Sequence, residues 1–134
     1  QQRSLKSLNL SKNLLTDSFL INISQFNCPL MLQSLNLSQN KLSSVCFKYI
    51  NSNFSCLSTL QLINLSYNNL NASNSSYMDF KEFILLAGQN EINVDFENCY
   101  LNKNQIKLVN FLINQGQSLY FNLLKNGVDQ EILK

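Results

Sequence analysis

Apolar residues recur with one particular spacing three times in the first half of the chain, in the stretches 5–15, 32–42 and 60–70. In each stretch two aliphatic residues lie two positions apart, with one leucine three positions before them and another five positions after them. Residues two apart share one side of a β-strand, but the outer leucines reach that side only if the chain bends. The spacing therefore predicts a short strand that runs into a turn, with these side chains directed into one core.

An asparagine occupies a fixed place in this pattern, just after the strand. Asn13, Asn40 and Asn68 hold that place and are 27 and 28 residues apart, an interval typical of repeat proteins. The buried N–H and C=O groups of a turn need partners, and a side-chain amide supplies both a donor and an acceptor. We therefore expect an inward-pointing column of amides that joins the turns of neighbouring units as part of the scaffold.

Two fainter copies of the pattern follow, in the stretches 91–101 and 118–128, with Cys99 and Asn126 in the asparagine position. Their first leucine position is held by Glu91 and Ser118. The chain begins without a methionine and ends in an incomplete unit, and no polar capping unit is recognisable, so we expect it to be part of a longer protein. It is expected to form a single domain, residues 1–134, whose five units span residues 5–31, 32–59, 60–90, 91–117 and 118–134.

Between the strand motifs, apolar residues recur at helical spacing. Phe80, Phe83, Ile84 and Ala87 lie on one face of a helix, which argues against an alternative alignment with Asn90 in the asparagine position. Each unit is therefore expected to contain a strand and a helix, and neighbouring units to share one core. The predicted strands lie near residues 7–10, 34–37, 62–65, 93–96 and 120–123, and the predicted helices near residues 17–26, 44–53, 77–88 and 104–115.

The pattern L-x-x-L-x-L-x-x-N/C-x-L resembles the signature of leucine-rich repeat proteins. The repeat length and the intervening helices are similar to those of the ribonuclease-inhibitor-like subclass, and the resemblance extends over essentially the whole chain. It implies an α/β fold, a right-handed solenoid with a curved parallel sheet on the concave side and helices on the convex side. It also implies that a protein partner binds the concave face or its edges.

Composition and net charge argue against some classes of binding partner. The chain has 134 residues, of which 45% are hydrophobic and only 13% charged, with a net charge of +2. This balance gives no case for nucleic acid or a membrane surface as partner, and no apolar run has the length of a membrane span. The abundance of Asn, Gln and Ser is compositional and resembles proteins encoded by AT-rich protist genomes.

The four cysteines have two interpretations. Cys28 and Cys56 occupy one repeat position, and Cys46 and Cys99 fall on core positions, so we expect free, buried thiols. The alternative is an extracellular disulfide framework, which the seven N-x-S sequons would also suit. Those sequons begin at Asn9, Asn22, Asn36, Asn53, Asn64, Asn71 and Asn74.

Catalysis has little support in the sequence. The chain has no histidine, three glycines and no nucleophile or phosphate-loop motif, so we expect no enzyme activity, cofactor, metal site or small-molecule substrate.

The residues that alternate with the strand leucines should face outward, beside a neighbouring column that includes Ser11, Ser38, Ser66 and Glu97. The candidate partner-binding residues of the concave face are Asn9, Lys12, Asn36, Gln39, Asn64, Tyr67, Asp95, Asn98, Asn122 and Lys125.

The leading functional hypothesis is a non-enzymatic scaffold that binds protein partners within a larger cytoplasmic assembly. Low surface charge suits a protein whose surface is largely covered, and in a protist such an assembly would include ciliary or cytoskeletal ones. The alternative is an extracellular or cell-surface recognition receptor, which would need disulfides and glycans.

Overall fold

The computed structural model describes residues 5–23, 32–52, 59–73, 75–115 and 121–126. In these ranges the protein has an α/β fold in which short strands and helices alternate along the chain. The strands are β1 (Ser7–Asn9), β2 (Ser34–Asn36), β3 (Leu62–Asn64), β4 (Asn93–Asp95) and β5 (Phe121–Asn122). The helices are α1 (Ser18–Ile23), α2 (Cys46–Ser52), α4 (Ser75–Gln89) and α5 (Lys103–Asn114).

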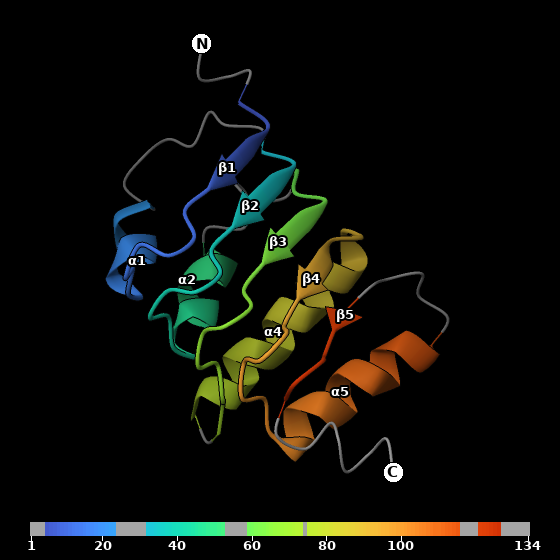
Figure 1. Cartoon of the computed structure of the whole chain (residues 1–134). Coiled ribbons are helices and arrows are strands. Elements are labelled where there is room, and N and C mark those ends of the chain that lie inside the picture. The colour runs from blue at the N-terminus through green and yellow to red at the C-terminus, as the bar shows by residue number, and fades with distance from the viewer. Residues whose placement is uncertain (1–4, 24–31, 53–58, 74, 116–120, 127–134) are drawn as a thin grey trace.

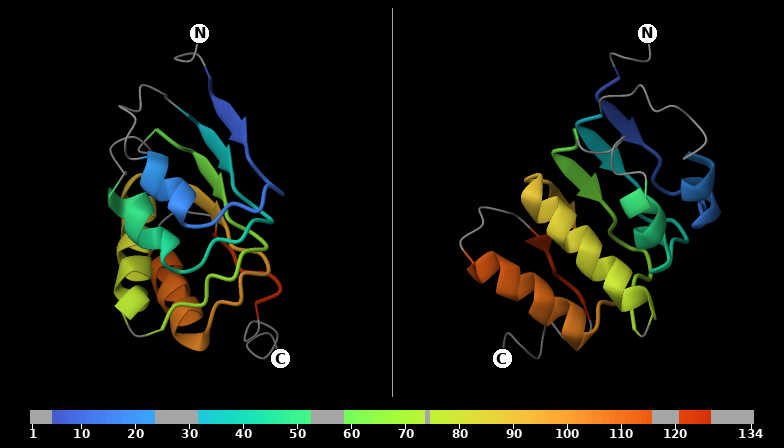
Figure 2. Two further views of the ribbon diagram at one scale, coloured as in Figure 1. Left: turned by 90° about the vertical axis from the view of Figure 1, so that its left-hand side faces the viewer. Right: turned by 180° about the vertical axis from the view of Figure 1, so that it is seen from behind.

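The strands form one parallel sheet in which spatial order follows sequence order. The register aligns equivalent motif positions, so that Leu8, Leu35, Ile63, Val94 and Phe121 lie side by side. All the described helices cover the same face of the sheet and leave the other face open (Figures 1 and 2). We call this uncovered side the open face.

The predicted elements are confirmed where the structure describes them. Each strand begins within one residue of its predicted start and ends one residue before the predicted end, and α4 and α5 lie within two residues of their predicted bounds. Residues 84–87 are helical, so the strand alignment through Asn90 is excluded. The predicted ends at residues 24–26, 53 and 120 lie outside the described residues.

The core lies between the sheet and the helices and is richest in aromatic rings at its centre. Phe47 of α2 is in contact with Phe80 and Phe83 of α4, with ring centroids 5.2 Å apart in each case. Phe96 stacks on Phe121 of the next unit with centroids 6.4 Å apart. Because these rings come from four successive units, the units cannot bury their apolar faces independently.

Burial is lower at the β1 end of the sheet. Leu8, Leu10 and Leu15 are half-buried, whereas the equivalent residues of the second unit, such as Leu37, are fully buried. Leu14 is 71% exposed. No helix in the described ranges is both long and apolar enough to cross a lipid bilayer.

Candidate functional site

The asparagine column connects neighbouring units at Asn40, Asn68 and Asn126, as predicted. Asn13, which was expected to point inward as well, is exposed, and its side chain donates only to C=O groups of its own turn. The Oδ1 atom of Asn40 accepts the backbone N–H groups of Asn13 and Leu15 at 2.8 and 2.9 Å, and its Nδ2 atom donates to the C=O of Leu10 at 3.0 Å. Asn68 and Asn126 make the same kind of bonds to the units before them. These amides are buried and fully used by the backbone, so they are scaffold.

In the fourth unit, Cys99 occupies the motif position that asparagine holds in the other units, and its side chain makes fewer hydrogen bonds to the preceding unit. Its thiol donates to the C=O of Leu65 in the preceding unit, with an Sγ–O distance of 3.1 Å. The N–H of Leu70 is bound by the backbone C=O of Cys99 at 2.9 Å, whereas the equivalent N–H of Leu42 is bound by an asparagine side chain. The backbone thus supplies the acceptor that the cysteine side chain lacks.

The first outward column on the open face, at the carboxyl ends of the strands, also has a structural role. In each of its residues a side-chain oxygen accepts the backbone N–H two positions further on, at 2.9 to 3.1 Å. Such side-chain-to-backbone bonds close a turn and end the strand. The residues of this column are Asn9, Asn36, Asn64, Asp95 and Asn122.

These turns correct one expectation. Ser38 and Ser66 were predicted to face outward beside this column, but each is only 5% exposed. The chain has left the strand by this point, because Asn36 and Asn64 bind the N–H groups of the two serines and bend the backbone there. Strand alternation therefore stops applying after the asparagine.

The second outward column consists of residues in the left-handed region of backbone conformation. Their φ angles lie between 53° and 60°, a region that non-glycine residues seldom occupy. Each of these residues comes directly before the asparagine or cysteine of the motif. Four of the five side chains are exposed and that of Asn98 is half-buried. The residues of this column are Lys12, Gln39, Tyr67, Asn98 and Lys125.

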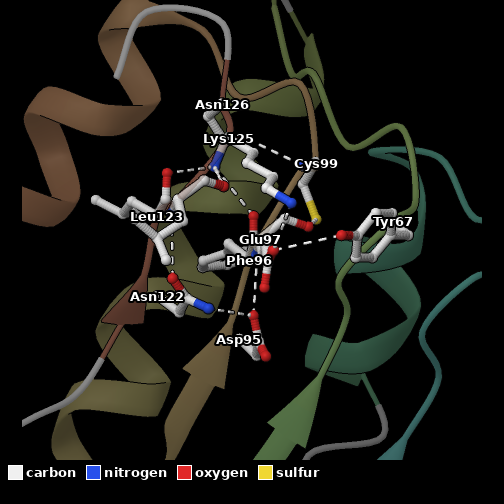
Figure 3. Close-up of polar contacts among 10 residues, drawn as sticks. Tyr67, Asp95, Phe96, Glu97, Cys99, Asn122, Leu123, Lys125 and Asn126 are labelled. Atoms are coloured by element: carbon white, nitrogen blue, oxygen red, sulfur yellow. Dashed lines mark hydrogen bonds and ion pairs between the residues drawn. The ribbon is translucent and has the colours of Figure 1, made fainter. Parts of the chain in front are cut away.

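Both columns contribute to one cluster of polar contacts near the end of the sheet. The hydroxyl of Tyr67 donates to Oε2 of Glu97 at 3.3 Å, and Nζ of Lys125 lies 3.5 Å from the same oxygen. Beside them, Nδ2 of Asn122 donates to Oδ1 of Asp95 at 3.0 Å. Figure 3 shows these five side chains coming together from three successive units. We call Tyr67, Asp95, Glu97, Asn122 and Lys125 the tyrosine cluster.

The tyrosine cluster presents one exposed aromatic ring among polar groups. Tyr67 is 40% exposed, and its hydroxyl donates to Glu97 at 3.3 Å. The Lys125 side chain is 63% exposed, which makes its contact with Glu97 a weak surface ion pair. An aromatic ring held in place among polar groups is typical of a contact residue at a protein interface.

The structure brings together four of the ten candidate residues, namely Tyr67, Asp95, Asn122 and Lys125. The other six candidates lie in the same two columns of the first four units, without side-chain bonds to one another in the described part of the chain. Glu97 joins the cluster but was missing from the candidate list. Its signal in the sequence is a carboxylate at a motif position that holds serine in the first three units.

A second surface feature lies at the loops that follow the strands. An open groove of about 840 Å³ is lined by residues that include Lys41, Asn69, Asn71 and Tyr100. Nδ2 of Asn71 donates to the C=O of Tyr100 at 3.0 Å, and the Tyr100 side chain is 58% exposed. Tyr100 also has a positive φ, of 59°. It therefore resembles Tyr67 in residue type, exposure and backbone but belongs to a different surface.

The described cysteines are unpaired and buried. Cys46 and Cys99 are free and fully inaccessible, as predicted, and Cys28 and Cys56 lie outside the described residues. Burial raises the pKa of the Cys99 thiol to about 12 and raises that of Cys46 well above its ordinary value. In the described ranges, no group of three histidine, cysteine, aspartate or glutamate residues has a geometry that could hold a metal ion.

A scan against known protein families gives no match, and neither does a search of curated proteins.

Proposed function

We propose that the chain is a right-handed leucine-rich repeat solenoid of the ribonuclease-inhibitor-like subclass, and that its open face binds a protein partner. The repeat assignment is supported by five aligned strands, helices on one face, and the side-chain amides of Asn40, Asn68 and Asn126, which bind the turn of the preceding unit. Repeats of this kind are expected to curve, with the open face on the concave side.

The observation that carries the binding proposal is the position of Tyr67 in the tyrosine cluster. The polar side chains of the first outward column already bind their own backbone turns, so they supply shape and hydrogen-bonding surface rather than strong anchors. Tyr67 adds a large, partly exposed aromatic ring whose hydroxyl donates to the Glu97 carboxylate. A partner would bury this ring against its own apolar side chains while its polar groups bind the neighbouring asparagines and carboxylates.

The proposed role is non-enzymatic, as a scaffold within a larger cytoplasmic assembly, of which ciliary and cytoskeletal ones are examples. Two features support a reducing compartment. Cys46 and Cys99 are free thiols in the core. Of the sequon residues on the open face, Asn36 and Asn64 use Oδ1 in a turn and are half-buried, which leaves little room for a glycan.

Site-specific photo-crosslinking tests the proposed surface. A photoreactive phenylalanine analogue is placed at position 67 in one variant and at position 100 in another, and each is irradiated in extract of the source cells. Tyr100 is the matched control, because it is an exposed tyrosine with positive φ outside the open face. The proposal expects one protein to be crosslinked from position 67 and not from position 100.

The crosslinked protein is then purified and its affinity is measured directly. Tyr67→Ala should weaken binding by about tenfold to a hundredfold, the usual effect of removing an interface tyrosine, while Tyr100→Ala should leave it unchanged. Both variants should keep the unfolding midpoint of the parent chain. A complex that crosslinks from position 100 and tolerates Tyr67→Ala would place the partner on the loop groove and overturn the proposal.

A further inference from the structure

We propose that the outer surface of α4 and α5 is a second interaction surface, and that its partner is an amphipathic helix whose apolar side chains are flanked by Asp and Glu. This surface lies on the helical side of the molecule, opposite the open face, and does not depend on the tyrosine cluster. The observations that lead to it are large apolar side chains exposed on both helices, lysines beside them, and a spacing that suits a further helix.

The exposed apolar side chains are not part of the core. Met78 and Leu85 of α4 are 62% and 40% exposed, and Phe111 of α5 is 58% exposed. The core is formed by other positions of the same helices, such as Phe83 and Val109, which are fully buried. A helix of a folded domain places the apolar residues that the fold needs on one inward stripe. The outward side chains therefore lie outside the set that the fold uses.

These three side chains belong to one surface. α4 and α5 pack side by side, which Figure 2 shows from behind, and near their beginnings Nδ2 of Asn102 donates to the C=O of Ala72 at 2.8 Å. Leu85 is the eleventh residue of α4 and Phe111 the ninth of α5, so at about 1.5 Å per residue they lie at similar heights along the two helices. Met78 lies two turns before Leu85 on the same side of α4.

The charged side chains next to Leu85 and Phe111 are lysines. Lys81 lies one turn before Leu85, and Lys107 lies one turn before Phe111, so each lysine is a neighbour of the apolar residue on its helix surface. Both lysines are exposed, and neither forms an ion pair with a described residue. The surface is therefore apolar with a positive border.

The exposed carboxylate of α4 lies on the other side of this helix. Glu82 follows Asp79 by three residues and shares its side, and the C=O of Asp79 accepts from Nδ2 of Asn51 in α2 at 3.0 Å. Glu82 therefore lies toward α2. Lys81 comes two residues after Asp79, a rotation of about 200° around the helix axis, so it lies on the side of α5. The sign of the charge is thus uniform where the two helices meet.

The spacing and the charge together identify the partner's chemistry. Met78 and Leu85 are separated by two helical turns, about 10 Å, which matches the spacing of apolar residues along one face of another helix. Asp and Glu beside that apolar face would pair with Lys81 and Lys107. A second copy of this chain is the poorer match, because a symmetric pairing through this surface would place one basic border against another.

Selection from a displayed library of random peptides tests this inference. The library is selected on the immobilised parent chain and depleted on the double variant Leu85→Ser, Phe111→Ser, so that the peptides that remain need these two side chains. Because both positions are exposed, the double variant should keep the urea midpoint of the parent. An enriched peptide is then synthesised, and its affinity is measured for single variants of the chain.

The single variants have matched controls of the same residue type. Phe111→Ser removes an apolar side chain from the surface, and Leu14→Ser removes an exposed apolar side chain elsewhere. Lys107→Glu reverses a charge of the surface, and Lys41→Glu reverses an exposed charge at the loop groove.

The expected results concern both the peptides and the variants. The enriched peptides should carry apolar residues at i, i+3 or i+4, and i+7 together with Asp or Glu, and should become helical on binding in circular dichroism. Phe111→Ser should weaken binding at least about tenfold. Lys107→Glu should weaken it about threefold or more at low salt, and less as salt is added. Leu14→Ser and Lys41→Glu should leave the affinity unchanged.

Three outcomes would overturn the inference. The first is that no peptide survives depletion, or that the survivors are basic or uncharged. The second is binding of the parent chain to vesicles of phosphatidylcholine and phosphatidylserine that Phe111→Ser abolishes, since the surface would then contact a membrane. The third is self-association of the parent chain in sedimentation that Phe111→Ser abolishes, since the occupant would then be a second copy.

Discussion

The Oδ1 atom of Asn68 accepts the backbone N–H of Leu42, which lies 26 residues earlier in the chain, at 3.0 Å. Its Nδ2 atom donates to the C=O of Leu37 in the same earlier unit, also at 3.0 Å. Both partners lie in the core, and Asn68 is only 2% exposed. One side-chain amide therefore joins the turns of two units by hydrogen bonds, in a buried place where water cannot substitute for it.

Removal of this amide should be costly. Asn68→Ala leaves the buried N–H of Leu42 without its partner and removes one donor each from the C=O groups of Leu37 and Leu65, so we expect it to lower the free energy of unfolding by about 3 kcal/mol. Asn13→Ala at the equivalent position should cost about 1 kcal/mol, because Asn13 is exposed and bonds within its own turn. Urea denaturation of both variants measures the difference, and equal losses would show that the inter-unit bonds contribute nothing.

The contrast between buried and exposed positions of the motif gives a second prediction. Leu37 is fully buried, so Leu37→Ala should cost about 2–5 kcal/mol through lost contacts and a cavity. Gln39, two residues later, is exposed, and Gln39→Ala should change stability by no more than about 0.5 kcal/mol. Thermal and urea unfolding of the two variants would test this, and similar losses would contradict the assigned orientation of the motif.

The strands and helices were predictable from the sequence because their signal is local. The two strand residues of each motif and the helical spacing of Phe80, Phe83 and Ile84 depend only on neighbouring positions. The outward orientation of Asn36 and Asn64 follows from the same alternation. Where the backbone leaves this periodicity, as at Ser38, the prediction was wrong, because a side-chain hydrogen bond bends the chain there.

Contacts between units were harder to predict, and Gln105 shows why. It lies in the first turn of α5, where a glutamine is ordinarily exposed, yet it is 0% exposed. Its Oε1 atom accepts the N–H groups of Ala72 and Asn102 at 3.0 Å, and its Nε2 atom donates to the C=O of Leu70 at 3.1 Å. Leu70 and Ala72 belong to the preceding unit, so no local pattern identifies them as its partners. Glu97 was missed in the same way, since Tyr67 and Lys125 come from the units on either side.

The environment of Gln105 leads to a third prediction. Gln105→Ala should lower the free energy of unfolding by about 2–3 kcal/mol, because it removes the partners of buried backbone groups in two units. Gln89→Ala in α4 is the control, since Gln89 is exposed and its loss should cost less than about 0.5 kcal/mol. Hydrogen exchange should in addition show faster exchange at the Ala72 amide in the Gln105→Ala variant. Unchanged protection of that amide would mean that the Gln105 contact is dispensable.

The buried thiols give a fourth prediction, on reactivity. A cysteine reacts with iodoacetamide as the thiolate, and both burial and a raised pKa suppress that form. At pH 8 in the folded protein, Cys46 and Cys99 should therefore remain unmodified while the same residues react fully in denaturant. Mass spectrometry of peptides from the two samples measures this, and rapid native labelling of Cys99 would show that its unit opens readily.

The same thiol predicts how stability should change with pH. The pKa of Cys99 is raised from its ordinary value of 9.0 to about 12 by burial, so between these values the unfolded chain loses the thiol proton and the folded chain keeps it. The unfolded state then binds fewer protons, and stability falls as pH rises. This single group contributes a slope of up to about 1.4 kcal/mol per pH unit above pH 9. Lysines and tyrosines also titrate in this range, so the comparison is with Cys99→Ala, whose stability should fall less steeply between pH 9 and pH 10.5. Parallel curves for the two proteins would show that the Cys99 thiol ionises as easily in the folded state as in the unfolded chain.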